Sequence, residues 1–152
     1  MLGEDCLYAE GFWPPGVATL AEAQRARCER ICRKLDLQPS DHLVEIGTGW
    51  GGFALYAARH YGCRVTTTTI SREQHALASE RIAAAGLSDR VSLLLSDYRD
   101  LDGQYDKLVS IEMIEAIGHQ YLDTYLAKCA SLLKPDGLAL IQASPTGWPS
   151  SR

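Results

Sequence analysis

The stretch HLVEIGTGWGG, residues 42–52, decides the fold of this chain. Its apolar start predicts a buried strand over 42–47 that breaks into a glycine-rich turn and then into a helix. Glycines at 47, 49, 51 and 52 allow positive φ angles and a close approach of the backbone to a ligand. The first N–H groups of the following helix lack partners within the helix and can bind a polar group. The stretch therefore predicts a cofactor site of the nucleotide type.

The second predicted strand, over 64–69, distinguishes two kinds of cofactor site. Three of the glycines fit the G-x-G-x-x-G dinucleotide pattern, which also expects an acid about 20 residues further on. The strand reads RVTTTT and ends at Thr69, with no acid there. An acid lies instead inside the first strand, at Glu45. Because a buried carboxylate needs partners, we expect ligand or backbone donors to contact Glu45.

The rest of the chain alternates predicted helices and strands joined by short connections. Thr19 and Glu22 form a capping box that opens the first helix. Helices are expected at 19–37, from the glycine turn to 61, at 72–85 and at 121–133; strands at 42–47, 64–69, 91–95, 106–111 and 138–142, the last after a turn at 134–137. This alternation predicts an α/β fold, a mostly parallel sheet of five strands with helices on both faces.

Composition and charge narrow the class of protein. With 152 residues, 46% hydrophobic and 22% charged, the chain fits one soluble globular domain. A net charge of -4 with scattered basic residues argues against a nucleic-acid partner. The start MLGEDC has acids where a signal peptide carries Lys or Arg, and no apolar run has the length of a membrane span. We therefore expect a cytoplasmic protein.

Five cysteines occur without a C-x-x-C pair and without histidine at metal-ligand spacing. We therefore expect reduced thiols and no metal site. Cys28 and Cys32 are one helical turn apart, which predicts small apolar residues on one face of a helix.

Six blocks of sequence, in order, resemble one enzyme family. They are Cys6 and Tyr8 near the start, TLAEAQRA at 19–26, EIGTGWGG at 45–52, TISREQ at 69–74, DYRD at 97–100 and SIEMIEAIGHQYL at 110–122. Together they resemble the S-adenosylmethionine-dependent methyltransferases of the cyclopropane-fatty-acyl-phospholipid synthase family. The resemblance implies a Rossmann-like class I methyltransferase domain over 1–143, with an N-terminal helical segment at 1–38 and an unstructured tail at 144–152.

The resemblance also implies how S-adenosylmethionine is held at its methionine and ribose ends. Gly47, Gly49 and Gly51 would cradle the methionine end, with Glu45, Thr48 and Trp50 beside them. The alternative for Trp50 is that it packs in the hydrophobic core and does not contact the cofactor. Thr69 and Gln74 would hold the ribose hydroxyls in place of the usual acid. For Gln74 the alternative is a capping box with Ser71, because S-x-x-Q is also that signature.

The adenine end would lie at the third and fourth predicted strands. Asp97, Tyr98 and Arg99 follow the third strand, where such enzymes bind the adenine edge and cover its face. Asp97 as a simple turn residue is the alternative. Ile111, at the start of the block IEMIEAIG, is the last cofactor contact that the resemblance implies.

Glu115 matches the family's catalytic glutamate by its position in that block. The resemblance implies that Glu115 and Cys6 hold a bicarbonate ion, which acts as the base. A glutamate in the first turn of a helix is the simpler explanation of Glu115. Gln142 stands where several members carry a bicarbonate-binding histidine. Glu4 and Asp5 depart from the family, which has Tyr-Ser there.

The resemblance implies an unsaturated phospholipid or fatty acyl substrate and peripheral contact with the inner membrane face. The family's C-terminal strands and lipid-facing region are missing, so the chain looks truncated. Strand 138–142 would then be an exposed apolar edge, which favours a homodimer through that edge. Two other functions stay open: an amine methyltransferase of the same fold, and a non-catalytic fragment that binds the cofactor.

Overall fold

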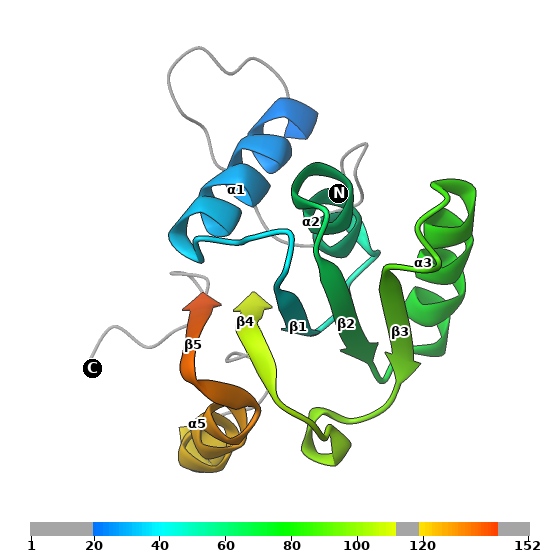
Figure 1. Cartoon of the computed structure of the whole chain (residues 1–152). Coiled ribbons are helices and arrows are strands. Elements are labelled where there is room, and N and C mark those ends of the chain that lie inside the picture. Colours follow the sequence, from blue (N-terminus) through cyan, green and yellow to red (C-terminus); the bar gives the residue numbers. More distant parts are fainter. Residues whose placement is uncertain (1–19, 112–118, 143–152) are drawn as a thin grey trace.

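The computed structural model describes residues 20–111 and 119–142. Its helices and strands alternate as predicted (Figure 1). They are α1 (Leu20–Lys34), β1 (His42–Ile46), α2 (Gly52–Tyr61), β2 (Arg64–Thr69), α3 (Arg72–Ala84), β3 (Val91–Leu95), β4 (Tyr105–Ile111), α5 (Leu122–Ser131) and β5 (Leu133–Gln142), with short 3-10 helices η1 (Tyr98–Asp100) and η2 (His119–Tyr121). Thr19, and with it the predicted capping box, lies outside the described residues.

The five described strands form one sheet in the order β3-β2-β1-β4-β5 (Figure 1). All four neighbouring pairs are parallel. The predicted five-stranded parallel sheet is therefore confirmed. Strand β1 lies at its centre, between β2 and β4, so the carboxyl end of β1 meets the carboxyl ends of both neighbours at one edge of the sheet.

The sheet is covered on both faces, which explains why β1 is apolar almost throughout. Leu43 packs into one hydrophobic cluster with Phe53 of α2 and with residues of α1. Val44 and Ile46 pack into a second cluster with Tyr125 of α5. Successive β1 side chains thus point to opposite faces, as the two-residue period of a strand requires.

Helix α1 is hydrogen-bonded to α2 through the carboxylate of Glu29. Glu29 accepts hydrogen bonds from the hydroxyl groups of Tyr56, at 2.6 Å, and Tyr61, at 2.7 Å. Its other partner is Arg33, whose Nε donates at 2.7 Å. The tyrosine hydroxyls and Arg33 hold the pKa of Glu29 below its usual value. Charge-assisted hydrogen bonds of this kind orient the two helices more firmly than apolar contact alone.

The four described cysteines are free and buried. Cys28 and Cys32 belong to the same core cluster, so the prediction that they are apolar residues on one helix face is confirmed. Burial raises the pKa of the Cys63 thiol to about 11 and that of Cys32 further still. These thiols are therefore packing residues rather than nucleophiles.

The end of the first helix was predicted wrongly. Helix α1 ends at Lys34 rather than near residue 37, and Pro39 does not stop it. Asp36 adopts a left-handed φ of 50°. Its N–H donates to the carbonyl of Arg33 and the N–H of Leu37 donates to the carbonyl of Cys32, at 3.0 and 3.1 Å. This is the Schellman pattern, which caps the helix with two backbone hydrogen bonds.

The predicted turn at 134–137 lies inside a strand. Strand β5 begins at Leu133, which pairs with Tyr105, and the register then jumps so that Leu138 pairs with Lys107. The intervening residues form an irregularity in the β4–β5 ladder. The turn-forming sequence KPDG therefore produces a bulge within β5 instead of a connection before it.

We predict that Gly137→Ala destabilises the protein by about 1–3 kcal/mol, because its Cβ would overpack the bulge. That atom would lie 2.9 Å from Leu133 Cδ2, 3.0 Å from the Lys134 carbonyl oxygen and 3.2 Å from that of Asp106. Urea unfolding measures the change in the free energy of unfolding. Gly86→Ala is the comparison, since nothing lies within 4 Å there and only its φ of +72° opposes a side chain. A Gly137 variant as stable as the wild type would contradict the overpacking.

Candidate functional site

A pocket of about 550 Å³ lies at the carboxyl ends of the central strands. Its lining residues end or follow β1 and β2, follow β3, or come from the first turns of α3 and α5 and from η2: Ile46, Gly47, Thr68, Thr69, Ile70, Ser71, Gln74, Ser96, Asp97, Tyr98, Arg99, Tyr121 and Thr124. Ligands of open α/β sheets bind at this edge, outside the carboxyl ends of the strands. The pocket brings together six of the predicted cofactor residues: Gly47, Thr69, Gln74, Asp97, Tyr98 and Arg99.

The glycine turn forms the wall of the pocket at the end of β1. Gly47, Gly49 and Gly51 have φ angles of 94°, 56° and 91°, which L side chains rarely adopt. The N–H groups of Gly47 and Thr48 both donate to the Thr68 carbonyl, at 3.0 and 2.9 Å, so the turn is tied to the end of β2. Of the three glycines, Gly47 lines the pocket.

Two polar side chains of the pocket are joined at the end of β2. The hydroxyl of Thr69 donates to Gln74 Oε1 at 2.9 Å and accepts from the N–H of Ser71 at 3.1 Å. The alternative for Gln74, a capping box with Ser71, is confirmed for one of its two hydrogen bonds. Ser71 does cap α3, because its Oγ accepts from the Gln74 N–H at 3.2 Å, but the Gln74 side chain is bonded to Thr69. The glutamine amide therefore faces the pocket already oriented.

After β3, Asp97 is both a capping residue and part of the pocket wall. Its Oδ1 accepts from the N–H of Arg99 at 2.9 Å, which caps η1, and its two oxygens accept from the Arg99 guanidinium at 3.0 and 2.8 Å. These bonds hold the pKa of Asp97 below its usual value. Tyr98 contacts Tyr125 edge to face, with ring centroids 5.2 Å apart. An ionised acid and a positioned aromatic ring therefore flank the pocket.

Glu45 is buried in β1, two residues before the glycine turn, and does not line the pocket. Its Oε1 accepts from the Thr67 hydroxyl at 2.8 Å, and that hydroxyl lies 2.8 Å from Thr48 Oγ1. A hydroxyl has one proton, so Thr48 donates to Thr67. Among the described residues the partner of Glu45 is therefore a side-chain hydroxyl rather than a backbone donor, and the expected contact with a ligand stays a prediction. Burial raises the pKa of Glu45 to about 8, which the Thr67 hydrogen bond only partly opposes.

Several predicted cofactor residues lie away from the pocket lining. Thr48 turns its hydroxyl into the Glu45 network. Trp50 is half-buried, and its carbonyl accepts from Arg81 Nη1 at 2.8 Å. Ile111 is packed against the core and pairs in register with Gln142 at the ends of β4 and β5. Cys6 and Glu115 fall outside the described residues.

The pocket also contains residues that sequence reasoning missed, among them Ile70, Tyr121 and Thr124. Ile70 is 76% exposed, an apolar residue directly after the end of β2. A large apolar side chain beside the predicted ribose residues was a signal that could have identified it. Tyr121 and Thr124 carry no such signal, because only the packing of α5 brings them to the pocket.

A family model and curated proteins of known name both match most of this chain. A family model described as mycolic acid cyclopropane synthetase matches residues 1–148. The cyclopropane-fatty-acyl-phospholipid synthase of Escherichia coli is 42% identical over 141 residues, 93% of this chain and 36% of that protein. The tuberculostearic acid methyltransferase of Mycobacterium tuberculosis is 45% identical over 129 residues, 85% of this chain and 30% of that protein.

Among solved structures, the mycolic acid cyclopropane synthase CmaA1 complexed with SAH and CTAB superimposes with a TM-score of 0.87 at 29% identity. The alignment covers 92% of this chain and 49% of that one, which confirms the Rossmann-like methyltransferase fold. The chain spans about a third of the length of the two curated relatives. On the family match over residues 1–148 and the sequence identity to these relatives, the chain belongs to the mycolic acid cyclopropane synthetase family.

Proposed function

We propose that this chain is the S-adenosylmethionine-binding part of a methyltransferase that transfers a methyl carbon to the double bond of an unsaturated acyl chain. The observation that carries the proposal is the bonded pair of Thr69 and Gln74 beside the glycine turn, inside a pocket of about 550 Å³. Family membership supports it, as does the bound SAH of the related structure.

The pocket residues fit the parts of S-adenosylmethionine in order. A hydroxyl and an amide, from Thr69 and Gln74, offer donors and acceptors to the ribose hydroxyls. Tyr98 and Ile70 provide aromatic and aliphatic surface for the flat adenine ring. Gly47 lets the backbone approach the methionine end without a side chain in the way.

Once bound, S-adenosylmethionine supplies a methyl group activated by its positively charged sulfur. The π electrons of the acyl double bond would attack this carbon as the carbon–sulfur bond breaks with its electrons on sulfur, which would leave a carbocation on the acyl chain. A base must then remove a proton from the transferred carbon so that its electron pair closes the ring. The site must also keep water from the cation.

We assign the base to a bicarbonate held by Glu115, Cys6 and Gln142, as the family resemblance implies. Gln142 ends β5 and pairs in register with Ile111, four residues before Glu115 along the chain. The ends of β4 and β5 lie at the same edge of the parallel sheet as the glycine turn. That placement supports Gln142 as a contributor to the reaction side of the pocket.

The second candidate function is methylation of a lipid double bond without ring closure, in which the carbocation would lose a proton from a neighbouring acyl carbon and form a new double bond. The two curated relatives differ in this respect by name, one a cyclopropane synthase and the other a tuberculostearic acid methyltransferase.

No helix among the described residues has both the length and the apolar character needed to cross a bilayer. We propose that the protein contacts its lipid substrate at the membrane surface. We also propose that two copies of the protein form a homodimer through strand β5.

We predict that Thr69→Val and Gln74→Ala each weaken binding of S-adenosylhomocysteine about 3- to 10-fold, the value of one lost hydrogen bond. Isothermal titration calorimetry measures the dissociation constant, with NAD as a ligand that should not bind. Thr66→Val is the matched control on the same strand, because the Thr66 hydroxyl contacts His42 at 2.8 Å and does not line the pocket. Unchanged affinity in both pocket variants would place the ribose elsewhere.

We predict that Glu45 makes stability fall as pH rises. Its pKa is about 8 in the folded protein and 4.5 ordinarily, so between these values the folded state holds the extra proton. The contribution is present in full below pH 4.5 and is lost as pH rises towards 8, by about 1.4 kcal/mol per pH unit at the steepest. Thermal unfolding from pH 5 to 8 should show this slope flattened in Glu45→Gln. Parallel curves for the two proteins would mean that Glu45 does not titrate in this range.

We predict that Glu115→Gln lowers cyclopropane formation roughly 100-fold or more, because the base loses its holder. The assay uses oleoyl-phosphatidylglycerol vesicles and labelled S-adenosylmethionine, with the acyl product identified by gas chromatography and mass spectrometry. Glu80→Gln, a change of the same kind at an exposed position of α3, should retain the wild-type rate. A wild-type product that is methylated but open supports the second candidate function, and an unaffected Glu115 variant removes that residue from the mechanism.

A further inference from the structure

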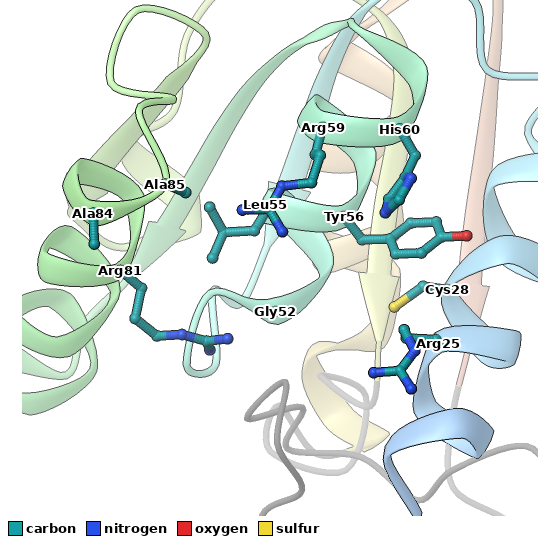
Figure 2. A pocket seen from close by; sticks show the side chains of 10 residues that line it. All are labelled: Arg25, Cys28, Gly52, Leu55, Tyr56, Arg59, His60, Arg81, Ala84 and Ala85. Carbon is teal, nitrogen blue, oxygen red and sulfur yellow. The ribbon is translucent and has the colours of Figure 1, made fainter.

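A second pocket, of about 430 Å³, lies between helices α1, α2 and α3 (Figure 2). Its lining includes Arg25 of α1, Arg59 and His60 of α2, and Arg81 of α3. Figure 2 shows the three guanidinium groups directed toward the space between the helices. Arg25 and Arg59 are exposed, so the pocket opens to solvent on this side.

The charged side chains among the described lining residues of this pocket are all basic. No Asp or Glu is among its described lining residues, although the chain as a whole has a net charge of -4. Three guanidinium groups around one space attract anions, and the planar fork of arginine matches the oxygens of a phosphate group in pairs. The described lining is therefore basic, on a chain whose net charge is negative.

The walls of the pocket are held in place by neighbouring contacts. Arg81 Nη1 donates to the Trp50 carbonyl at 2.8 Å, which ties the arginine to the glycine turn. The Tyr56 hydroxyl donates to Glu29 at 2.6 Å, and the Tyr56 ring contacts that of His60, with centroids 4.4 Å apart. A ligand would thus meet preorganised groups at Arg81 and His60, which reduces the entropic cost of binding there.

The remaining lining distinguishes a lipid phosphate from a small inorganic anion. Leu55 is 8% exposed and Cys28 3% exposed, and Ala84 and Ala85 complete an apolar side next to the arginines. A phosphate ester with a glycerol stem offers both an anion for the guanidinium groups and carbon atoms for this side. Inorganic phosphate offers only the anion.

We propose that the pocket lined by Arg25, Arg59 and Arg81 binds the phosphate of an anionic phospholipid headgroup. The chemistry of the site calls for a phosphate group, and the choice of a lipid as its source rests on the proposed function. Gly52 lines this pocket and Gly47 lines the cofactor pocket, so the two sites lie on either side of the glycine turn. A headgroup bound here would hold the lipid beside the methyl donor.

The test is calorimetric titration of the 152-residue chain with dihexanoyl-phosphatidylglycerol below its micelle concentration. Dihexanoyl-phosphatidylcholine and inorganic phosphate are titrated in parallel. Arg59→Gln should weaken phosphatidylglycerol binding about fivefold, and Arg25→Gln combined with Arg59→Gln about 25-fold, the expected effect of one and two arginines near an anionic lipid. The matched control is Arg64→Gln, which removes the same charge from an exposed position on β2.

Binding of phosphatidylglycerol that the pocket variants weaken and the Arg64 control leaves unchanged supports the proposal. Equal affinity for inorganic phosphate would overturn the lipid as the source of the phosphate. Absence of binding, or equal losses in the control, would overturn the site itself. Titration of the same samples with S-adenosylhomocysteine keeps the two proposals apart, since its failure removes the cofactor assignment while the phosphate result still stands. Thermal unfolding confirms that each variant is folded.

Discussion

The burial of strand β1 on both faces is the constraint on which the rest of the structure depends. Leu43 is directed to the cluster under α1 and α2, and Val44 and Ile46 to the cluster under α5. A strand covered in this way must lie in the middle of a parallel sheet. Its end at Gly47 then opens at the edge where the neighbouring strands also end, and the cofactor pocket follows from that position.

The threonine-rich strand β2 supports this edge with a different contact at each residue. Thr67 donates to the buried Glu45, and the Thr68 carbonyl accepts the two N–H groups of the glycine turn. The Thr68 hydroxyl donates to the Ser96 carbonyl at 2.6 Å, which fixes the segment after β3. Thr69 then orients Gln74 at the pocket. Apolar β-branched residues would fill the same space and keep the backbone carbonyl at position 68, but they would remove the hydroxyl partners of Glu45, the Ser96 carbonyl and Gln74.

The glycine turn has a further consequence, because it borders two pockets of different chemistry. The cofactor pocket on one side contains neutral polar groups, aromatic rings and one ion pair. The pocket on the other side contains three arginines and a histidine. Arg81 contacts the turn through the Trp50 carbonyl, three residues after Gly47, so the two pockets adjoin the same backbone segment.

The sequence by itself determined the alternation of helices and strands, the parallel sheet, the glycine turn and the burial of Cys28 and Cys32. These features follow from periodicity and from local backbone preferences, which neighbouring residues carry. The resemblance of the sequence to a family also named Thr69 and Gln74, and the structure joins these two residues by a hydrogen bond in one pocket. Only the tertiary structure decided which residue of the turn lines the pocket, that β5 contains a bulge, and that three arginines from three helices share a pocket. Each of these depends on contacts between segments far apart in the chain, which no local pattern records.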